Sequence, residues 1–153
     1  MTTRRISSLI GLMLLGVSIS TATAQDVKTF PGLLCQPQTP TQAILRHARI
    51  AAMTNVSATA QIWLCPIVRD ATTANSLVSA QLVSTTGVTC ELFSRTKTAV
   101  LVDGNLPLRS VMQDGYRVWV YGALSGAPSG FYAFRCFVPP GEQVVSYLIN
   151  ERQ

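Results

Sequence analysis

The sequence has few charged residues. Only 12% of its 153 residues are Asp, Glu, Lys or Arg, against about 25% in an average domain. The 12 basic residues do not cluster, so the formal charge of +5 predicts no nucleic-acid partner. Hydrophobic residues make up 48% of the chain, which argues against a disordered or coiled-coil protein. A length near 150 residues favours one domain.

Residues for familiar catalytic or metal sites are also scarce. His47 is the only histidine, and no Gly-x-Ser-x-Gly turn accompanies it, which argues against a Ser-His-Asp site. Neighbouring cysteines are 30, 25 and 46 residues apart, so the close pairs of a zinc site are missing. We therefore expect no metal and no cofactor. A hydrolase that places two of the seven acidic residues across a cleft stays open as an alternative.

Residues 1–24 have the three parts of a secretory signal peptide. Arg4 and Arg5 form a basic start, residues 9–19 form an apolar run, and Ala22-Thr23-Ala24 is typical of a cleavage site. The apolar run is far shorter than the roughly 20 residues that cross a bilayer. We expect export to the periplasm or the extracellular space, and no membrane span in the mature chain from Gln25 onward.

Four cysteines follow the signal: Cys35, Cys65, Cys90 and Cys136. An even number of cysteines in an exported domain predicts disulfides, here two. Alternation along the predicted strands places Cys90 and Cys136 on inward, apolar faces. Of the three pairings that the sequence permits, we therefore predict a Cys90–Cys136 bridge through the core, which leaves Cys35 for Cys65.

Short apolar runs, rich in β-branched and aromatic residues, recur between turn formers. This spacing predicts an all-β fold, a two-sheet antiparallel sandwich of jelly-roll or immunoglobulin-like type over residues 43–153. Residues 25–42 are rich in proline and are expected to form an extended lead-in. The predicted strands are 44–53, 59–68, 76–84, 88–95, 97–102, 116–122, 130–138 and 143–150.

The strand at 116–121 supplies the candidate binding site. Alternation places Arg117, Trp119 and Tyr121 on one face and the two valines with Tyr116 on the other. A buried Arg in mid-strand would be costly, so we expect its face to point outward. There it could stack on sugar rings or contact a partner protein. Trp119→Ala is then expected to leave stability nearly unchanged. The alternative is that this face is the buried one.

Four segments show a family resemblance. They are Cys65-Pro66-Ile67-Val68-Arg69-Asp70, Cys90, Phe131-Tyr-Ala-Phe-Arg-Cys136-Phe-Val-Pro-Pro140 and Ser146-Tyr147-Leu-Ile-Asn-Glu151. Together they resemble a loose group of small secreted bacterial β-sandwich proteins with Cys-Pro and Cys-x-x-Pro-Pro segments, over about residues 50–151. The resemblance implies an exported sandwich of bacterial origin and implies no activity.

These observations favour an exported, non-enzymatic binding or structural protein of the bacterial envelope or extracellular space. Its expected partner is a carbohydrate, a cell surface or another protein, and a fimbrial-like interaction subunit is the nearest alternative. A small secreted hydrolase that uses scattered carboxylates is the alternative from a different class. Asn55-Val56-Ser57 also matches the acceptor sequence for N-glycosylation.

Overall fold

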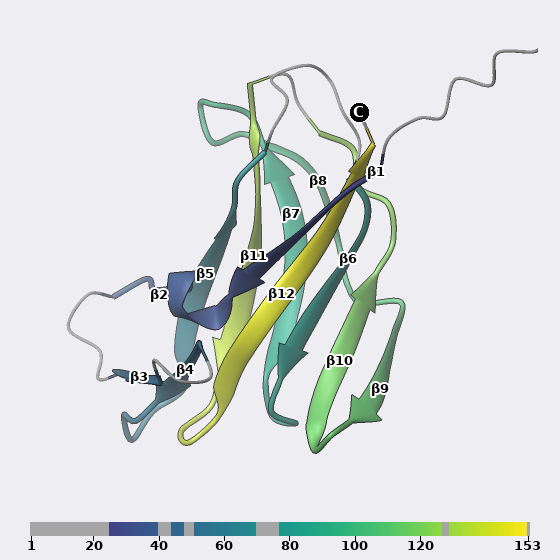
Figure 1. Ribbon diagram of the computed structural model, residues 1–153. Coiled ribbons are helices and arrows are strands. Elements are labelled where there is room, and N and C mark those ends of the chain that lie inside the picture. Colours follow the sequence, from purple (N-terminus) through teal and green to yellow (C-terminus); the bar gives the residue numbers. More distant parts are fainter. Residues whose placement is uncertain (1–24, 40–43, 48–50, 70–76, 127–128, 153) are drawn as a thin grey trace, which may run out of the picture.

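The computed structural model describes residues 25–39, 44–47, 51–69, 77–126 and 129–152. The chain forms two antiparallel β-sheets that pack face to face, as the sequence predicts (Figure 1). A single 3₁₀ turn, η1 (Gly32–Leu34), is the one helical element among the described residues. None of the described helical structure is long and apolar enough to cross a membrane. The predicted signal peptide lies outside the described residues.

The larger sheet has seven strands in the order β3-β4-β12-β6-β10-β9, and β1 also pairs with β12. In Figure 1, β1 (purple) runs along β12 (yellow), and the β9–β10 hairpin lies at the far edge. The strands are β1 (Gln25–Pro31), β3 (Ile44–His47), β4 (Ala52–Asn55), β6 (Leu77–Ser84), β9 (Arg109–Gln113), β10 (Tyr116–Tyr121) and β12 (Gln143–Arg152).

The smaller sheet has five strands in the order β2-β5-β11-β7-β8. Its strands are β2 (Gln36–Pro37), β5 (Gln61–Ile67), β7 (Thr89–Arg95), β8 (Leu101–Asn105) and β11 (Phe131–Val138). Alternate residues of β11, among them Tyr132, Phe134 and Cys136, are buried against the larger sheet. Successive side chains of a strand point to opposite faces, so the residues between them lie on the outer face of this sheet.

Both predicted disulfides are present, Cys35–Cys65 and Cys90–Cys136. The Cys90–Cys136 bridge does not run through the core to the opposite sheet, however. Cys90 and Cys136 are directly paired on the neighbouring strands β7 and β11. The other bridge joins β5 to the residue just before β2. Both therefore link neighbouring segments at the smaller sheet.

The structure corrects the expected lead-in. Residues 25–31 form β1, which pairs with β12 at every position from Gln25 to Pro31. Next along the chain, β2 pairs with β5 at Gln36 and Pro37. The lead-in is extended, as predicted, but it completes both sheets instead of preceding them. The sandwich therefore begins near residue 25 and not at residue 43.

Two further predicted strands have different bounds. The single strand expected at 44–53 is a pair of strands, β3 and β4, that bond to each other, with Ala51 in the left-handed region at φ 54°. Residues 96–100 form a turn, in which the Ala99 N–H donates to the Thr96 carbonyl, so β8 starts only at Leu101. The sequence prediction missed β9 entirely.

Candidate functional site

The predicted binding face on β10 points inward. Tyr121 is fully buried, and its hydroxyl donates to the Cys90 carbonyl across the sandwich at 3.0 Å. Trp119 is half-buried against the core, and its Nε1 donates to the Ser84 Oγ at 3.1 Å. Alternation separates the two faces of β10 as predicted. The expectation that the face with Arg117, Trp119 and Tyr121 is exposed is wrong. Tyr121 in particular is inaccessible to a ligand.

Arg117 explains why this face can be buried. It lies near the turned end of β10, at the rim of the sandwich, where it is only half-buried. Its guanidinium carbon lies 5.1 Å from the centroid of the Trp119 ring, so the cation covers the tryptophan while its charge stays near water. A buried ionic partner is therefore unnecessary. The desolvation cost that favoured an outward face does not apply at a rim.

An arginine flanked by aromatic side chains also occurs on β11, and there it faces outward. Phe131 and Phe137 are 40% and 46% exposed, and the side chain of Arg135 is 50% exposed. These three residues alternate with the buried core residues of the strand. The sequence already places Arg135 on the face opposite Cys136. What sequence reasoning missed is that two phenylalanines share that face with it.

Residues of the neighbouring strands complete this surface. Register pairs Arg135 with Leu64 of β5 on one side and with Glu91 of β7 on the other. The Arg135 Nε donates to the Glu91 Oε1 at 2.8 Å. The two terminal guanidinium nitrogens have no partner among the described residues. An exposed pair of this kind adds little stability, but it holds the planar guanidinium in one orientation.

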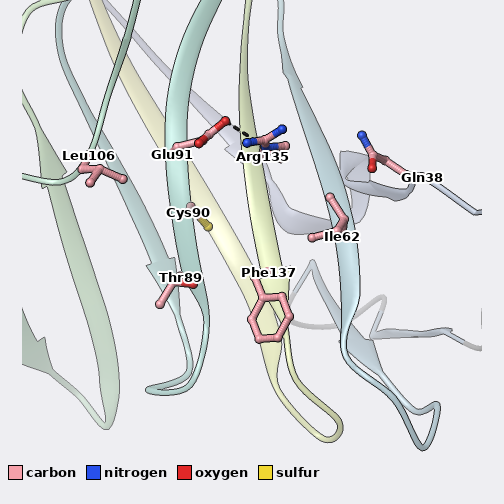
Figure 2. Close-up of a pocket in the computed structure, with 8 residues that line it drawn as sticks. All are labelled: Gln38, Ile62, Thr89, Cys90, Glu91, Leu106, Arg135 and Phe137. Atoms are coloured by element: carbon pink, nitrogen blue, oxygen red, sulfur yellow. Dashed lines mark ion pairs between the residues drawn. The ribbon is translucent and has the colours of Figure 1, made fainter.

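A hollow of about 430 Å³ lies over this ion pair, as Figure 2 shows. Its apolar lining comes from Ile62, Phe137 and Leu106, and its polar lining includes Gln38 and Thr89. Hollows of about 350 Å³ and 230 Å³ adjoin it on either side, toward β2 and toward β8. Small-molecule sites usually enclose about 300–1,000 Å³. The outer face of the smaller sheet, centred on Arg135, is therefore the candidate site.

One end of this face is closed by aromatic packing. Phe93 points outward from β7, yet only 6% of it is exposed. The Phe131 ring meets it edge to face at 6.4 Å, and the Arg95 guanidinium carbon lies 5.1 Å from its centroid. The face thus combines two guanidinium groups and one carboxylate with exposed aromatic surface.

Three of the described carboxylates have structural partners. Glu91 is bonded to Arg135, and Asp103 accepts from the N–H groups of Gly104 and Ser125. Glu142 accepts from the Gly87 N–H at 3.1 Å. Within the described ranges, no three His, Cys, Asp or Glu side chains are grouped as metal ligands would be. The hydrolase alternative therefore gains no support from the geometry.

A second cluster of charges is buried at the C-terminal end of β12. Glu151 is 4% exposed and lies between the Lys28 Nζ, at 3.5 Å, and the Arg69 Nε, at 3.6 Å. The Arg69 guanidinium carbon lies 4.8 Å from the centroid of the Tyr132 ring. Burial raises the pKa of the Tyr132 phenol, while the nearby Arg69 opposes that shift. The cluster joins β1 and β12 to Arg69, in the segment that follows β5 of the smaller sheet.

Two polar residues singled out by the sequence have structural roles. The His47 Nε2 lies 2.9 Å from the Thr54 Oγ1 across the β3–β4 hairpin. Asn55, the residue in the glycosylation sequence, is fully buried. Its side-chain amide donates to the carbonyls of Thr59 and Val138, at 2.9 and 2.8 Å. Asn55 therefore fixes the turn after β4 and is closed to a sugar-transferring enzyme.

Comparison with known proteins adds no relative: no family model matches the chain, and no curated protein sequence matches it. The function is therefore argued from the Arg135 face itself.

Proposed function

We propose that this protein is an exported, non-enzymatic binding protein of the bacterial envelope or extracellular space. Its ligand is a cell-surface carbohydrate, bound on the outer face of the smaller sheet. The observation that carries this proposal is the exposed row of Phe131, Arg135 and Phe137 beside a hollow of about 430 Å³. The two disulfides are typical of an oxidising compartment and support export.

The chemistry of the site selects a class of sugar. Phe137 presents an apolar ring, against which the C–H face of a pyranose can pack. The terminal nitrogens of Arg135 form a planar fork that suits a carboxylate. Gln38 and Thr89 supply hydrogen-bonding groups at the margin of the hollow. An acidic sugar, such as a uronic acid unit, satisfies all three features.

Rigidity of the smaller sheet favours binding. One disulfide fixes the segment before β2 to β5, and the other fixes β7 to β11. Ile62, Glu91, Arg135 and Phe137 all project from these strands. A face held in its binding conformation loses less conformational entropy when a ligand arrives.

A glycan array with neutral and acidic oligosaccharides, followed by calorimetric titration of the oxidised protein, tests this function. We expect binding to uronic-acid oligosaccharides, and a loss of about ten-fold or more in affinity in Arg135→Gln and in Phe137→Ala. Arg46→Gln removes an exposed arginine from the other sheet and is the matched control. Unchanged affinity in Arg135→Gln would place the sugar elsewhere, and an array without any acidic ligand would contradict the proposal.

A fimbrial-like interaction subunit is the second candidate, and a different observation favours it. Half of the large exposed hydrophobic side chains among the described residues fall between residues 100 and 112. They lie in and beside β8 and β9, the edge strands of the two sheets, and exposed apolar surface at a sheet edge is suited to a protein–protein contact. Charged substitutions there, such as Leu108→Lys, would abolish partner binding and leave sugar binding intact, which separates the two candidates.

A further inference from the structure

β9 is the last strand at one side of the larger sheet, and no described strand pairs with its outer edge. It pairs with β10, and all five of its residues are exposed. Asp114 and Gly115 join the two strands with φ of 51° and 82°, the conformation of a two-residue type I′ turn. Gln113 and Tyr116 close that turn, so alternation directs the backbone groups of Ser110 and Met112 toward the open side.

This edge lacks the usual protection against pairing. Natural edge strands are shielded by prolines, lysines, bulges or a covering loop. β9 has neither proline nor lysine, and its Val111 and Met112 are 48% and 56% exposed. Leu106 and Leu108, just before the strand, are 71% and 74% exposed. An apolar edge with open hydrogen-bonding groups is suited to a further β-strand.

We propose that two copies of this chain pair through β9, antiparallel, about a two-fold axis at Val111. Their larger sheets then form one continuous sheet. A two-fold axis perpendicular to a sheet keeps each side chain on its own face. Residues of the same face then lie opposite each other only if one residue lies on the axis, opposite its own copy. With Val111 on the axis, Ser110 of each copy faces Met112 of the other, and their open backbone groups meet.

Side chains on the outer face of the larger sheet favour this register. Val83 of β6, Val118 of β10 and Val111 of β9 are direct neighbours in one row across the sheet. Pairing Val111 with its copy joins the two rows into one row of valines. Cross-strand pairs of β-branched residues stabilise sheets. An axis at Ser110 would instead place Val111 opposite Arg109.

Charge is also complementary in the Val111 register. Arg109 at one end of β9 then lies beside the turn that carries Asp114 in the other copy, and the two-fold axis repeats this contact. An axis at Met112 would keep Arg109 near Asp114 but would place Val111 opposite Gln113, which breaks the row of valines. The contact involves only a short strand, so we expect a dimer that dissociates on dilution.

Sedimentation of the oxidised, exported protein from about 1 µM to about 1 mM tests the proposal. We expect the mass to double with rising concentration. Val111→Lys and Val111→Glu should each weaken dimerisation by about ten-fold or more, since like charges then meet at the axis. An equimolar mixture of the two variants should dimerise again. Val111→Thr, which keeps the β-branched shape, is the matched control and should behave as the wild type.

A wild-type protein that stays monomeric throughout this range would overturn the proposal. So would a dimer that Val111→Lys leaves intact, or a mixture that does not dimerise, because both results place the contact elsewhere. This test does not depend on the carbohydrate proposal, since β9 belongs to the other sheet.

Discussion

Trp119 shows how a single side chain is held at the rim of the sandwich. Its ring packs against the core, its Nε1 donates to Ser84, and the Arg117 guanidinium covers it. The apolar contact and the hydrogen bond are both lost when the ring is removed. Trp119 therefore contributes to stability, and the inward face of β10 is not accessible to a ligand from solution.

We predict that Trp119→Ala lowers the free energy of unfolding by about 2–3 kcal/mol, somewhat less than for a fully buried tryptophan. Trp119→Phe, which keeps an aromatic ring but removes the donor, should lose about 1 kcal/mol. Denaturant unfolding of the two variants and the wild type measures both values. A loss below 1 kcal/mol in Trp119→Ala would contradict the packing described for this residue.

For individual residues, the sequence predicts well which side chains share one face of a strand. It predicts less well whether that face points to the core or to solvent. Alternation groups Arg117 with Trp119 and Tyr121 whether the strand faces inward or outward, because the pattern is symmetric. The direction depends on what the other sheet presents, here the Cys90 carbonyl that accepts the Tyr121 hydroxyl. Phe131, Arg135 and Phe137 follow the same alternation, but β11 presents them to the outside.

Among the elements, η1 carries the chain from β1 in the larger sheet to β2 in the smaller one. Gly32 begins this turn and is buried against β12. A Cβ atom at this position would overlap the Val144 carbonyl oxygen, which belongs to the backbone of β12. Only glycine allows so close an approach. The position of β1 therefore depends on this residue.

We predict that Gly32→Ala lowers the free energy of unfolding by about 1–3 kcal/mol, because a backbone must move to admit the methyl group. Gly104→Ala is the matched control: its new Cβ would lie 3.5 Å from the nearest atom, an ordinary contact. That variant should stay within about 0.5 kcal/mol of the wild type. Urea unfolding of both variants provides the comparison. Equal losses would mean that the close approach at Gly32 is not the cause.

The bounds of a strand can be predicted from the sequence where its apolar alternation is strong. They cannot be predicted where the strand forms only because a neighbouring strand pairs with it. β5, β7 and β11 alternate clearly and were predicted closely. β1 forms because β12 offers it a partner, which no local pattern in 25–31 reveals. Ala51, Ala99 and Asp114 adopt left-handed conformations that residues other than glycine seldom take, so the turns at Ala51 and Ala99 were missed. Asp114-Gly115 is a typical sequence for a type I′ hairpin turn, a signal from which β9 could have been predicted.

In the whole molecule, the described disulfides do not cross between the sheets, so packing and hydrogen bonds must hold the two sheets together. The Tyr121 ring meets Phe134 of the smaller sheet at 5.1 Å, and Tyr147 meets the same ring at 5.7 Å. Their hydroxyls donate to backbone carbonyls of the smaller sheet, Tyr121 to Cys90 and Tyr147 to Pro66. Two tyrosines of the larger sheet thus link it to the sheet that carries the Arg135 face.

These links make the stability of the sandwich sensitive to alkaline pH. Burial raises the pKa of the Tyr121 and Tyr147 phenols above their usual value of 10.0. The unfolded chain therefore ionises first as the pH rises, and the folded state loses relative stability. The contribution of these groups is fully present below about pH 10 and is lost as the pH rises from there toward their raised pKa.

We predict that the free energy of unfolding, measured in urea from about pH 8 to about pH 11, is constant at first and falls above pH 10. Tyr121→Phe should be about 1–3 kcal/mol less stable at pH 8, because the Cys90 carbonyl loses its donor. Its decline above pH 10 should be shallower, because one fewer buried phenol resists ionisation. Tyr116→Phe, at the half-exposed start of β10, controls for the loss of a hydroxyl as such. Parallel curves for Tyr121→Phe and the wild type would show that this phenol does not set the alkaline limit of the fold.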